Sequence, residues 1–543
     1  MADNKDPMIP DGDVNPIDTD YKVGQDNILV NVGPFGLDIH NRVFAISGLM
    51  VVAFVVLTLA FQNQVEPMFT SMRGWLTSNL DWFFLGAGNI FVLVCLGLVV
   101  SPLGKVRLGG TEATPDYTYL GWFSMLFAAG MGIGLMFFGV SEPLSHFGSA
   151  FGGTALENGV RTDWAPLGAA AGDAEAATRL AMAATIYHWA LHPWAIYAIL
   201  ALGLALFSFN KGLPLTVRSV FYPLLGERVW GWPGHLIDIL AVLATLFGLA
   251  TALGYGAAQA SSGLNFLFDV PLGNTTQIVL VIGITAIALF SVVAGLDAGV
   301  KRLSEINMIL AALLLLFVVA VGPTLDIVTG FFGNLGAYFQ HLPALSNPVG
   351  RDDANFSQGW TAFYWAWWIS WSPFVGMFIA RVSRGRTVRE FIVSVLIVPS
   401  LACVLWMTVF GETAIIQFVR DGYEAATKAE LPLQLFSMLD GLPLAQITSF
   451  IAIILVVVFF VTSSDSGSLV IDVIAAGGKV DAPTPQRVFW CVFEGLVAIA
   501  LILGGGLVAL QAMAVSAGLP FTIVLLMSTV AVIKGLASEP RSS

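Results

Sequence analysis

The stretch WTAFYWAWWISWSPF, residues 360–374, is the most informative segment of this chain. It places five of the chain's 15 tryptophans in one short apolar segment. Indole faces attract cations that can shed their water, such as quaternary ammonium groups. An arginine-rich polar edge follows at residues 381–390. The stretch therefore predicts a membrane-spanning segment that holds a small cationic or zwitterionic molecule.

The composition also indicates a membrane protein. The chain is 57% hydrophobic and only 11% charged, whereas soluble domains carry about 25% charged residues. The net charge of -12 argues against nucleic acid as a partner. The three cysteines, Cys95, Cys403 and Cys491, fall in apolar segments and are expected to be reduced packing residues, with no disulfide and no metal cluster.

Hydropathy predicts an all-α membrane protein with about twelve transmembrane helices. Eighteen of the 24 Lys and Arg residues fall in segments that are cytoplasmic if the N-terminus is inside, and six fall outside. This bias places both termini in the cytoplasm. The polar, Asp-rich first 40 residues lack the pattern of a cleaved signal peptide. The expected spans are 43–61, 82–100, 118–140, 180–207, 236–261, 276–296, 304–325, 357–380, 390–411, 446–475, 486–507 and 509–533.

The third span contains glycine at every second position, Gly130, Gly132 and Gly134. Each glycine weakens a helix by roughly 0.5–1 kcal/mol relative to alanine. Local unwinding would expose backbone groups, which a membrane tolerates only beside a cavity or within protein. Close packing of small residues between helices explains the pattern equally well. A dinucleotide-binding fingerprint is excluded because no βαβ context surrounds it.

The tenth span carries hydroxyls and one carboxylate within FFVTSSDSGS, residues 459–468. Hydroxyl groups in a helix can simply bond to carbonyls one turn back. An acid inside a membrane is costly and usually functional, however. The clustered oxygen atoms favour a site for a hard cation such as sodium.

The fourth span holds a second aromatic group in HWALHPWAIY, residues 188–197. His188 and His192 have the spacing of a helical zinc pair, but the associated Glu is missing and Pro193 disturbs the helix, so zinc is disfavoured. The aromatic residues fit either an interfacial belt or a site shared with the tryptophan-rich span, and the sequence favours the shared site.

Together these stretches resemble the betaine/choline/carnitine transporter family over about residues 40 to 530. The resemblance implies two peripheral helices and then two inverted five-helix repeats, with the site at their interface. The implied divisions are a cytoplasmic tail at 1–42, peripheral helices at 43–117, repeats at 118–328 and 357–533, an outer amphipathic helix and loop at 329–356, and a short cytoplasmic tail at 534–543. In this family the outer helix joins protomers into a homotrimer.

The resemblance also implies which residues bind the substrate. The trimethylammonium group would lie among Trp189, Trp194, Tyr197 and Trp368, which we call the cage, with Trp367 and Trp371 along the path. A quaternary ammonium group donates no hydrogen bonds, so ring faces and shape must hold it. A substrate carboxylate would meet free amides of the unwound Gly130–Gly134 stretch.

Sodium sites are implied in the same way. One site would use Ala128 and Met131 with Phe459, Thr462 and Ser463. A second would use two threonines one turn apart in the fifth span, together with Phe374. Only Thr245 is present here, because the other position is Leu249, and two-sodium coupling is therefore in doubt.

The expected function is import of a zwitterionic betaine-type solute, such as glycine betaine or dimethylsulfoniopropionate, by a sodium-coupled symporter of the cell (inner) membrane. Choline-carrying members of the family have aspartate where this chain has Gly134, so a neutral site fits a zwitterion. A sodium-independent exchanger of the carnitine type and a membrane sensor remain as alternatives. No enzyme and no cofactor are expected, because no nucleophile–base pair or metal cluster is visible.

Overall fold

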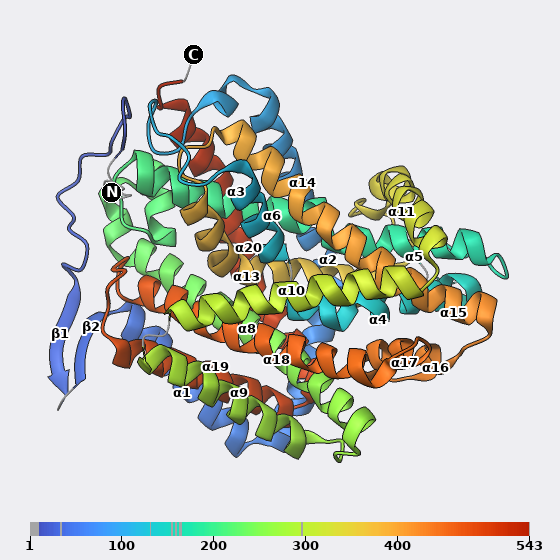
Figure 1. The fold of residues 1–543 in the computed structure, drawn as a ribbon. Helices are drawn as coiled ribbons and strands as arrows, with labels where there is room; N and C mark the ends of the chain where they lie inside the picture. Colours follow the sequence, from blue (N-terminus) through green and yellow to red (C-terminus); the bar gives the residue numbers. More distant parts are fainter. Residues whose placement is uncertain are drawn as a thin grey trace.

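The structure, a computed structural model, describes residues 10–541 apart from residues 33–34, 131, 154–155, 158–159, 162–165 and 295–296. Its described residues form long helices packed side by side (Figure 1). The long helices are α1 (Val43–Ala60), α2 (Gln62–Val100), α3 (Tyr119–Gly130), α4 (Ile133–Gly152), α5 (Ala174–Trp189), α6 (Leu191–Ala205), α8 (Trp232–Phe268), α9 (Asn274–Ala294), α10 (Asp297–Val321), α11 (Thr324–Leu345), α13 (Ala362–Val382), α14 (Val388–Met407), α18 (Ala445–Ala475), α19 (Thr484–Leu503) and α20 (Gly506–Ala537).

Shorter elements connect these helices. They are α7 (Tyr222–Leu225), α12 (Ala354–Phe356), α15 (Thr413–Asp421), α16 (Ala425–Lys428) and α17 (Gln434–Asp440), with the antiparallel pairs β1 (Asn27–Val32) and β2 (Phe35–His40), and β3 (Leu156–Glu157) and β4 (Val160–Arg161). The all-α membrane fold expected from hydropathy is confirmed. Every expected span coincides with a helix or a pair of consecutive helices.

Ten helical segments among the described residues are long and apolar enough to cross a membrane, or eleven if the bent pair α3–α4 is one span. The remaining expected span is α13. At 21 residues it is long enough to cross a membrane, but its mean hydropathy is lower than that of the other spans. Its Trp, Tyr, Ser and Pro residues count as polar on hydropathy scales. Instead, α13 lies at the centre of the bundle, packed against α6, α8 and α20.

Two of the expected spans are broken helices. The third span breaks within its glycine-rich stretch, and the fourth span breaks directly after Trp189. Helices α3 and α4 meet at a bend of 62°. The helix extends past residue 140, the end expected for this span, because α4 continues to Gly152. Helices α5 and α6 are separated at Ala190, whose backbone leaves helical geometry while its N–H still bonds to the Ile186 carbonyl. Both breaks lie beside the same cavity, described below.

The N-terminal segment, expected only as a polar tail, is folded against one end of the bundle. Figure 1 shows the β1–β2 hairpin at this end. Gln486 donates to the Asp38 carbonyl, and the Lys479 ammonium pairs with the Asp38 carboxylate. The described segments nearest to the two termini also meet, because Asn15 Nδ2 donates to the Ser538 carbonyl at 3.2 Å. Asn15 and the end of α20 therefore lie on the same face of the protein.

Helix α11 is the amphipathic helix expected between the seventh and eighth spans, and it begins at Thr324 rather than 329. One face packs inward through Ile327, Asn334 and Tyr338. The opposite face exposes Phe332 and Phe339. Asn334 anchors the helix to the helical turn between α14 and α15, since its amide donates to Glu412 at 2.9 Å.

Candidate functional site

A large cavity of about 1790 Å³ lies between the two broken spans and α13. It reaches from the middle of the bundle to the end where Asn15 meets the end of α20, since its lining includes Arg384, which pairs with Asp11. The lining also contains nearly all of the site residues expected from the sequence: Ala128, Gly130, Gly132, Gly134, Trp189, Trp194, Tyr197, Trp367, Trp368, Trp371, Phe374, Phe459, Thr462 and Ser463. Met131 lies outside the described residues.

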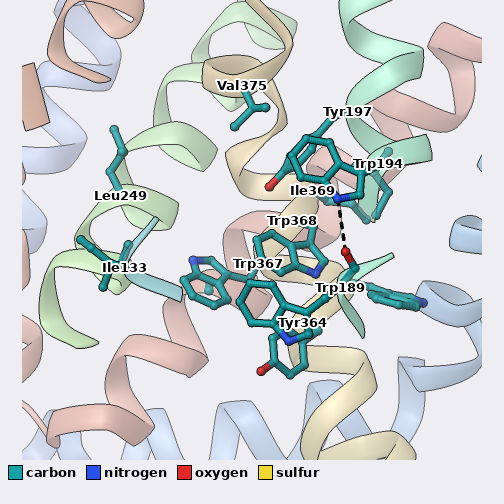
Figure 2. Packing of buried hydrophobic residues seen from close by; sticks show 14 of the residues in the cluster. Ile133, Trp189, Trp194, Tyr197, Leu249, Tyr364, Trp367, Trp368, Ile369 and Val375 are labelled. Carbon is teal, nitrogen blue, oxygen red and sulfur yellow. Dashed lines mark hydrogen bonds between the residues drawn. The ribbon is translucent and has the colours of Figure 1, made fainter. Parts of the chain in front are cut away.

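The cage residues form a continuous corner of aromatic rings in this cavity (Figure 2). Trp189 meets Trp368 edge-to-face with 4.9 Å between ring centroids. Tyr197 meets Trp368 at 6.1 Å and Trp194 at 5.3 Å, again edge-to-face. Trp367 stacks on Trp368 at 5.2 Å. The consecutive helices α5 and α6 and the distant helix α13 thus contribute rings to one corner.

The indole N–H groups of the cage are already bonded within the protein. Trp194 donates to the Trp189 carbonyl at 3.2 Å, the dashed line in Figure 2. Trp368 donates to the His188 carbonyl at 3.0 Å. These carbonyls are available because the chain breaks at Ala190. The hydrogen bonds fix the rings and leave their faces, rather than their donors, for a ligand without hydrogen-bonding groups.

The three glycines differ in what surrounds them. A Cβ at Gly134 would lie 2.7 Å from the Trp189 ring, and one at Gly130 would lie 3.3 Å from the Trp194 ring. A Cβ at Gly132 would meet nothing within 4 Å. Gly134 is therefore required as space for a cage indole. Gly130 and Gly134 do allow close packing, which was one of the two explanations of the glycine pattern. The groups that approach them closely include the cage rings Trp194 and Trp189.

The residues expected at the first sodium site come from α3 and α18 and border the same cavity. Ala128 lies near the end of α3, while Phe459, Thr462 and Ser463 lie on one stretch of α18. The Thr462 hydroxyl donates to the Val458 and Phe459 carbonyls at 3.0 and 3.2 Å. Its oxygen keeps lone pairs that can bind a cation.

The residues expected at a second sodium site are not brought together in the cavity. Phe374 lines it, but Thr245 does not, and the Thr245 hydroxyl donates to the Ala241 carbonyl at 2.7 Å. Leu249 packs its side chain over Gly467 of α18 instead. Figure 2 shows Leu249 on α8, away from the aromatic rings. An apolar contact thus occupies the place where the second threonine would supply oxygen.

A buried carboxylate beside the cage was missed by the sequence analysis. Glu142 of α4 lies two residues beyond the expected end of the third span, residue 140, and no role was expected for it. Its side chain is fully buried, and it accepts a hydrogen bond from Trp189 Nε1 at 2.8 Å. The available signal was the pair Glu142 and His146, which share one helical face four residues apart.

The two histidines of the fourth span are not directed at one ion. His188 Nδ1 lies 2.5 Å from Glu142, whereas His192 stacks on Trp365 and bonds to Asn89 at 3.0 Å. A different trio, Glu142, His146 and His188, offers ligand atoms within 4.8 Å of one another. These atoms already take part in hydrogen bonds, because His146 Nε2 and His188 Nδ1 both bond to Glu142 Oε1.

A second cavity of about 330 Å³ lies toward the other end of α13 and includes Gly359 in its lining. Phe138, Tyr255 and Phe363 line this smaller cavity, and Trp367 lines the large one. The Trp367 ring packs against all three, with centroid distances of 6.2, 5.6 and 5.5 Å. One aromatic layer therefore separates the two cavities.

Comparison with protein families gives a match over residues 42–541 to the betaine/carnitine/choline family of transporters. The chain belongs to this family. It is a multi-pass membrane transporter and not an enzyme. The resemblance inferred from the aromatic, glycine and hydroxyl stretches is confirmed.

Several curated members of the betaine/carnitine/choline family are similar along nearly their whole length. A glycine betaine/proline/choline transporter of Vibrio parahaemolyticus is 75% identical, covering 98% of this chain and 97% of that protein. Glycine betaine transporter 1 of the same organism is 53% identical, covering 96% and 97%. A glycine betaine transporter of Bacillus subtilis is 40% identical, covering 88% and 91%. All three of these relatives are named as transporters of glycine betaine, and the first is named for proline and choline as well.

Proposed function

We propose that this transporter is a sodium-coupled symporter that imports a zwitterionic betaine-type solute across the cell (inner) membrane. Glycine betaine, dimethylsulfoniopropionate and related compounds are the substrate candidates. The observation that carries the proposal is the convergence of the cage and of the α3 and α18 oxygen donors on one cavity. The names of the relatives, which specify glycine betaine, proline and choline, support the substrate class.

Recognition of the cationic end follows from the ring geometry. The cage offers indole and phenol faces, with its indole donors bonded elsewhere. A desolvated cation gains roughly 2 kcal/mol from such a ring face. The carboxylate end of a zwitterion binds toward the α3–α4 break. The first backbone N–H groups of α4, like those of any helix, have no acceptor within their own helix and can bind an anion.

Coupling follows from the position of the sodium residues. One sodium ion binds between Ala128, Met131, Phe459, Thr462 and Ser463 and joins α3 to α18. Bound sodium therefore favours the arrangement in which α3 and its glycines border the cage. The two cavities separated by one aromatic layer fit a transporter that opens its site to one side at a time.

Orientation and assembly complete the proposal. Both termini are cytoplasmic, in accordance with the distribution of Lys and Arg, so the large cavity faces the cytoplasm. The exposed apolar face of α11 joins three copies into a homotrimer within the lipid. The divisions of the chain follow the family pattern, with repeats at 118–328 and 357–533.

Uptake into proteoliposomes tests the proposal. Radiolabelled glycine betaine should accumulate when an inward sodium gradient is imposed, and uptake should collapse when potassium replaces sodium. Counterflow in the absence of sodium distinguishes the alternative. Rapid sodium-free exchange, without net accumulation, would identify an exchanger of the carnitine type instead.

A further inference from the structure

Glu142 is an acidic residue within the membrane-spanning part of the protein, and the functions described so far do not use it. It lies in α4, two turns after Gly134, and its side chain is fully buried. Burying a carboxylate at this depth is costly. Acidic residues inside a membrane therefore mark functional positions by default.

The contacts of Glu142 favour its ionised form. Oε2 accepts from Trp189 Nε1 at 2.8 Å and from the Tyr364 hydroxyl at 2.6 Å. Oε1 faces His188 Nδ1 at 2.5 Å and His146 Nε2 at 3.2 Å. Neutral histidines supply an N–H at each of these positions, and an indole N–H is a donor only. Four donors around one carboxyl group stabilise the charged state.

The negative charge of this group is not cancelled by a fixed positive one. In the part of the chain that the structure describes, Glu142 pairs with the two histidines and with no lysine or arginine. A neutral imidazole already supplies the one N–H that each histidine contact needs, so these contacts require no positive charge to balance the carboxylate. A charge in such a low-dielectric environment acts strongly on another charge nearby.

Trp189 connects this charge to the cavity. Its indole lies in the cage, with one edge against Trp368, and its N–H points to Glu142. A hydrogen bond to a carboxylate pushes electron density into the donor, since bonds in a chain polarise one another. A more electron-rich ring attracts a cation more strongly.

We propose that Glu142 is the fixed negative charge of the substrate site and a positioning residue for Trp189. It extends the substrate range to quaternary ammonium compounds that lack a carboxylate of their own, such as choline. A zwitterion carries its own counter-charge and gains less from Glu142. This inference rests on the proposed function of the cage, and it replaces the expectation that a glycine at position 134 leaves the site neutral.

Binding measurements on the purified, sodium-loaded protein test the proposal. Three ligands compete with radiolabelled glycine betaine: unlabelled betaine, choline, and the uncharged isostere of choline in which a carbon replaces the nitrogen. Each is measured with the wild type and with Glu142→Gln, which keeps the shape but removes the charge. The preference for choline over its isostere should shrink by about tenfold in Glu142→Gln, as expected for losing one charge–charge interaction at partly screened range.

Two further variants separate charge from structure. Tyr364→Phe removes a hydrogen bond to the same carboxylate but keeps the charge, so the preference for choline over its isostere should stay as in the wild type. If Glu142→Gln cannot be purified folded, Glu142→Asp takes its place, and it should keep the preference because it keeps the charge.

The proposal is overturned if Glu142→Gln weakens choline and its isostere equally, or if Glu142→Asp loses the preference. Either result would mean that Glu142 only stabilises the local structure and does not act on the substrate through its charge. A wild type that binds no glycine betaine would instead refute the proposed function on which the inference rests.

Discussion

At the scale of single residues, Gly134 shows how a small side chain positions a large one. The Trp189 ring occupies the space that a Cβ at position 134 would need, 2.7 Å away. Gly134→Ala should therefore shift Trp189 and raise the KM for glycine betaine by about tenfold, the order of losing part of one cation–π contact. Initial uptake rates over a range of substrate concentrations measure this.

Gly132→Ala is the matched control, because a Cβ at position 132 would meet nothing within 4 Å. It should leave KM close to that of the wild type. Equal effects of the two substitutions would mean that backbone flexibility, and not space for Trp189, is what the glycines provide. Gly134→Asp would displace Trp189 too, so it should not simply convert a betaine carrier into a choline carrier.

Trp368 tests the part played by aromatic faces. It touches both Trp189 and Tyr197 and belongs to the corner that the cavity exposes. Trp368→Leu should lower affinity for glycine betaine by about tenfold or more, while Trp368→Phe should lose less because a weaker π face remains. Competition binding measures both. Indistinguishable Leu and Phe variants would show that this ring is packing material.

At the scale of elements, α11 presents an unusual apolar surface. Phe332 and Phe339 are 69% and 58% exposed on the face opposite Asn334. The double substitution Phe332→Ala and Phe339→Ala should shift the purified protein from trimer toward monomer, since aromatic side chains dominate contact energy. Light scattering in detergent measures the mass. Phe290→Ala on α9, which is 68% exposed, is the control and should stay trimeric. A wild-type monomer would contradict the proposed assembly.

The junction between the N-terminal hairpin and α1 should respond to pH. His40 Nδ1 accepts from the backbone N–H groups of Arg42 and Val43 at 3.3 Å. Burial, aided by the Arg218 guanidinium, lowers the pKa of His40 to about 3. Unfolded histidine has a pKa of about 6.5, so the unfolded state gains the proton first, and His40 stabilises the fold less by about 1.4 kcal/mol per pH unit below that value.

Thermal unfolding between pH 7.5 and pH 5, values spanning the unfolded pKa of about 6.5, measures this effect. The melting temperature of the wild type should fall more over this range than that of His40→Asn, whose amide oxygen can still accept the same hydrogen bonds. Parallel slopes in the two proteins would remove His40 from the pH response.

At the scale of the whole molecule, the sequence predicted the helices better than their breaks and partners. Hydropathy located the spans because a membrane imposes long apolar runs. The aromatic and hydroxyl stretches predicted residues that the structure brings to one cavity. Glu142 was missed because the apolar run of this span ends near Val140, and the spacing of Glu142 and His146 is a weak sign that the helix continues into a polar cluster.

The N-terminal hairpin was missed for a different reason. Seven of the fourteen residues at 27–40 are apolar, but the segment is far too short for a membrane span, and the place of the hairpin depends on distant partners. Asn27 Nδ2 bonds to the Ala476 carbonyl at 2.9 Å, and Asp38 bonds to Gln486. Contacts across more than four hundred residues leave no local pattern in a single sequence.

Sodium coupling is the central claim about the whole protein, and it depends on α3 and α18 holding one ion between them. Each sodium ion moved inward across a membrane potential gains about 2.3 kcal/mol per 100 mV, which corresponds to about fortyfold accumulation of solute. The most direct measurement is the initial rate of glycine betaine uptake as a function of sodium concentration, in the wild type and in the double variant Thr462→Ala, Ser463→Ala. The wild type should show no uptake without sodium, and the variant should need a higher sodium concentration for half its maximal rate. Undiminished uptake in sodium-free buffer, or an unchanged sodium dependence in the variant, would contradict the account.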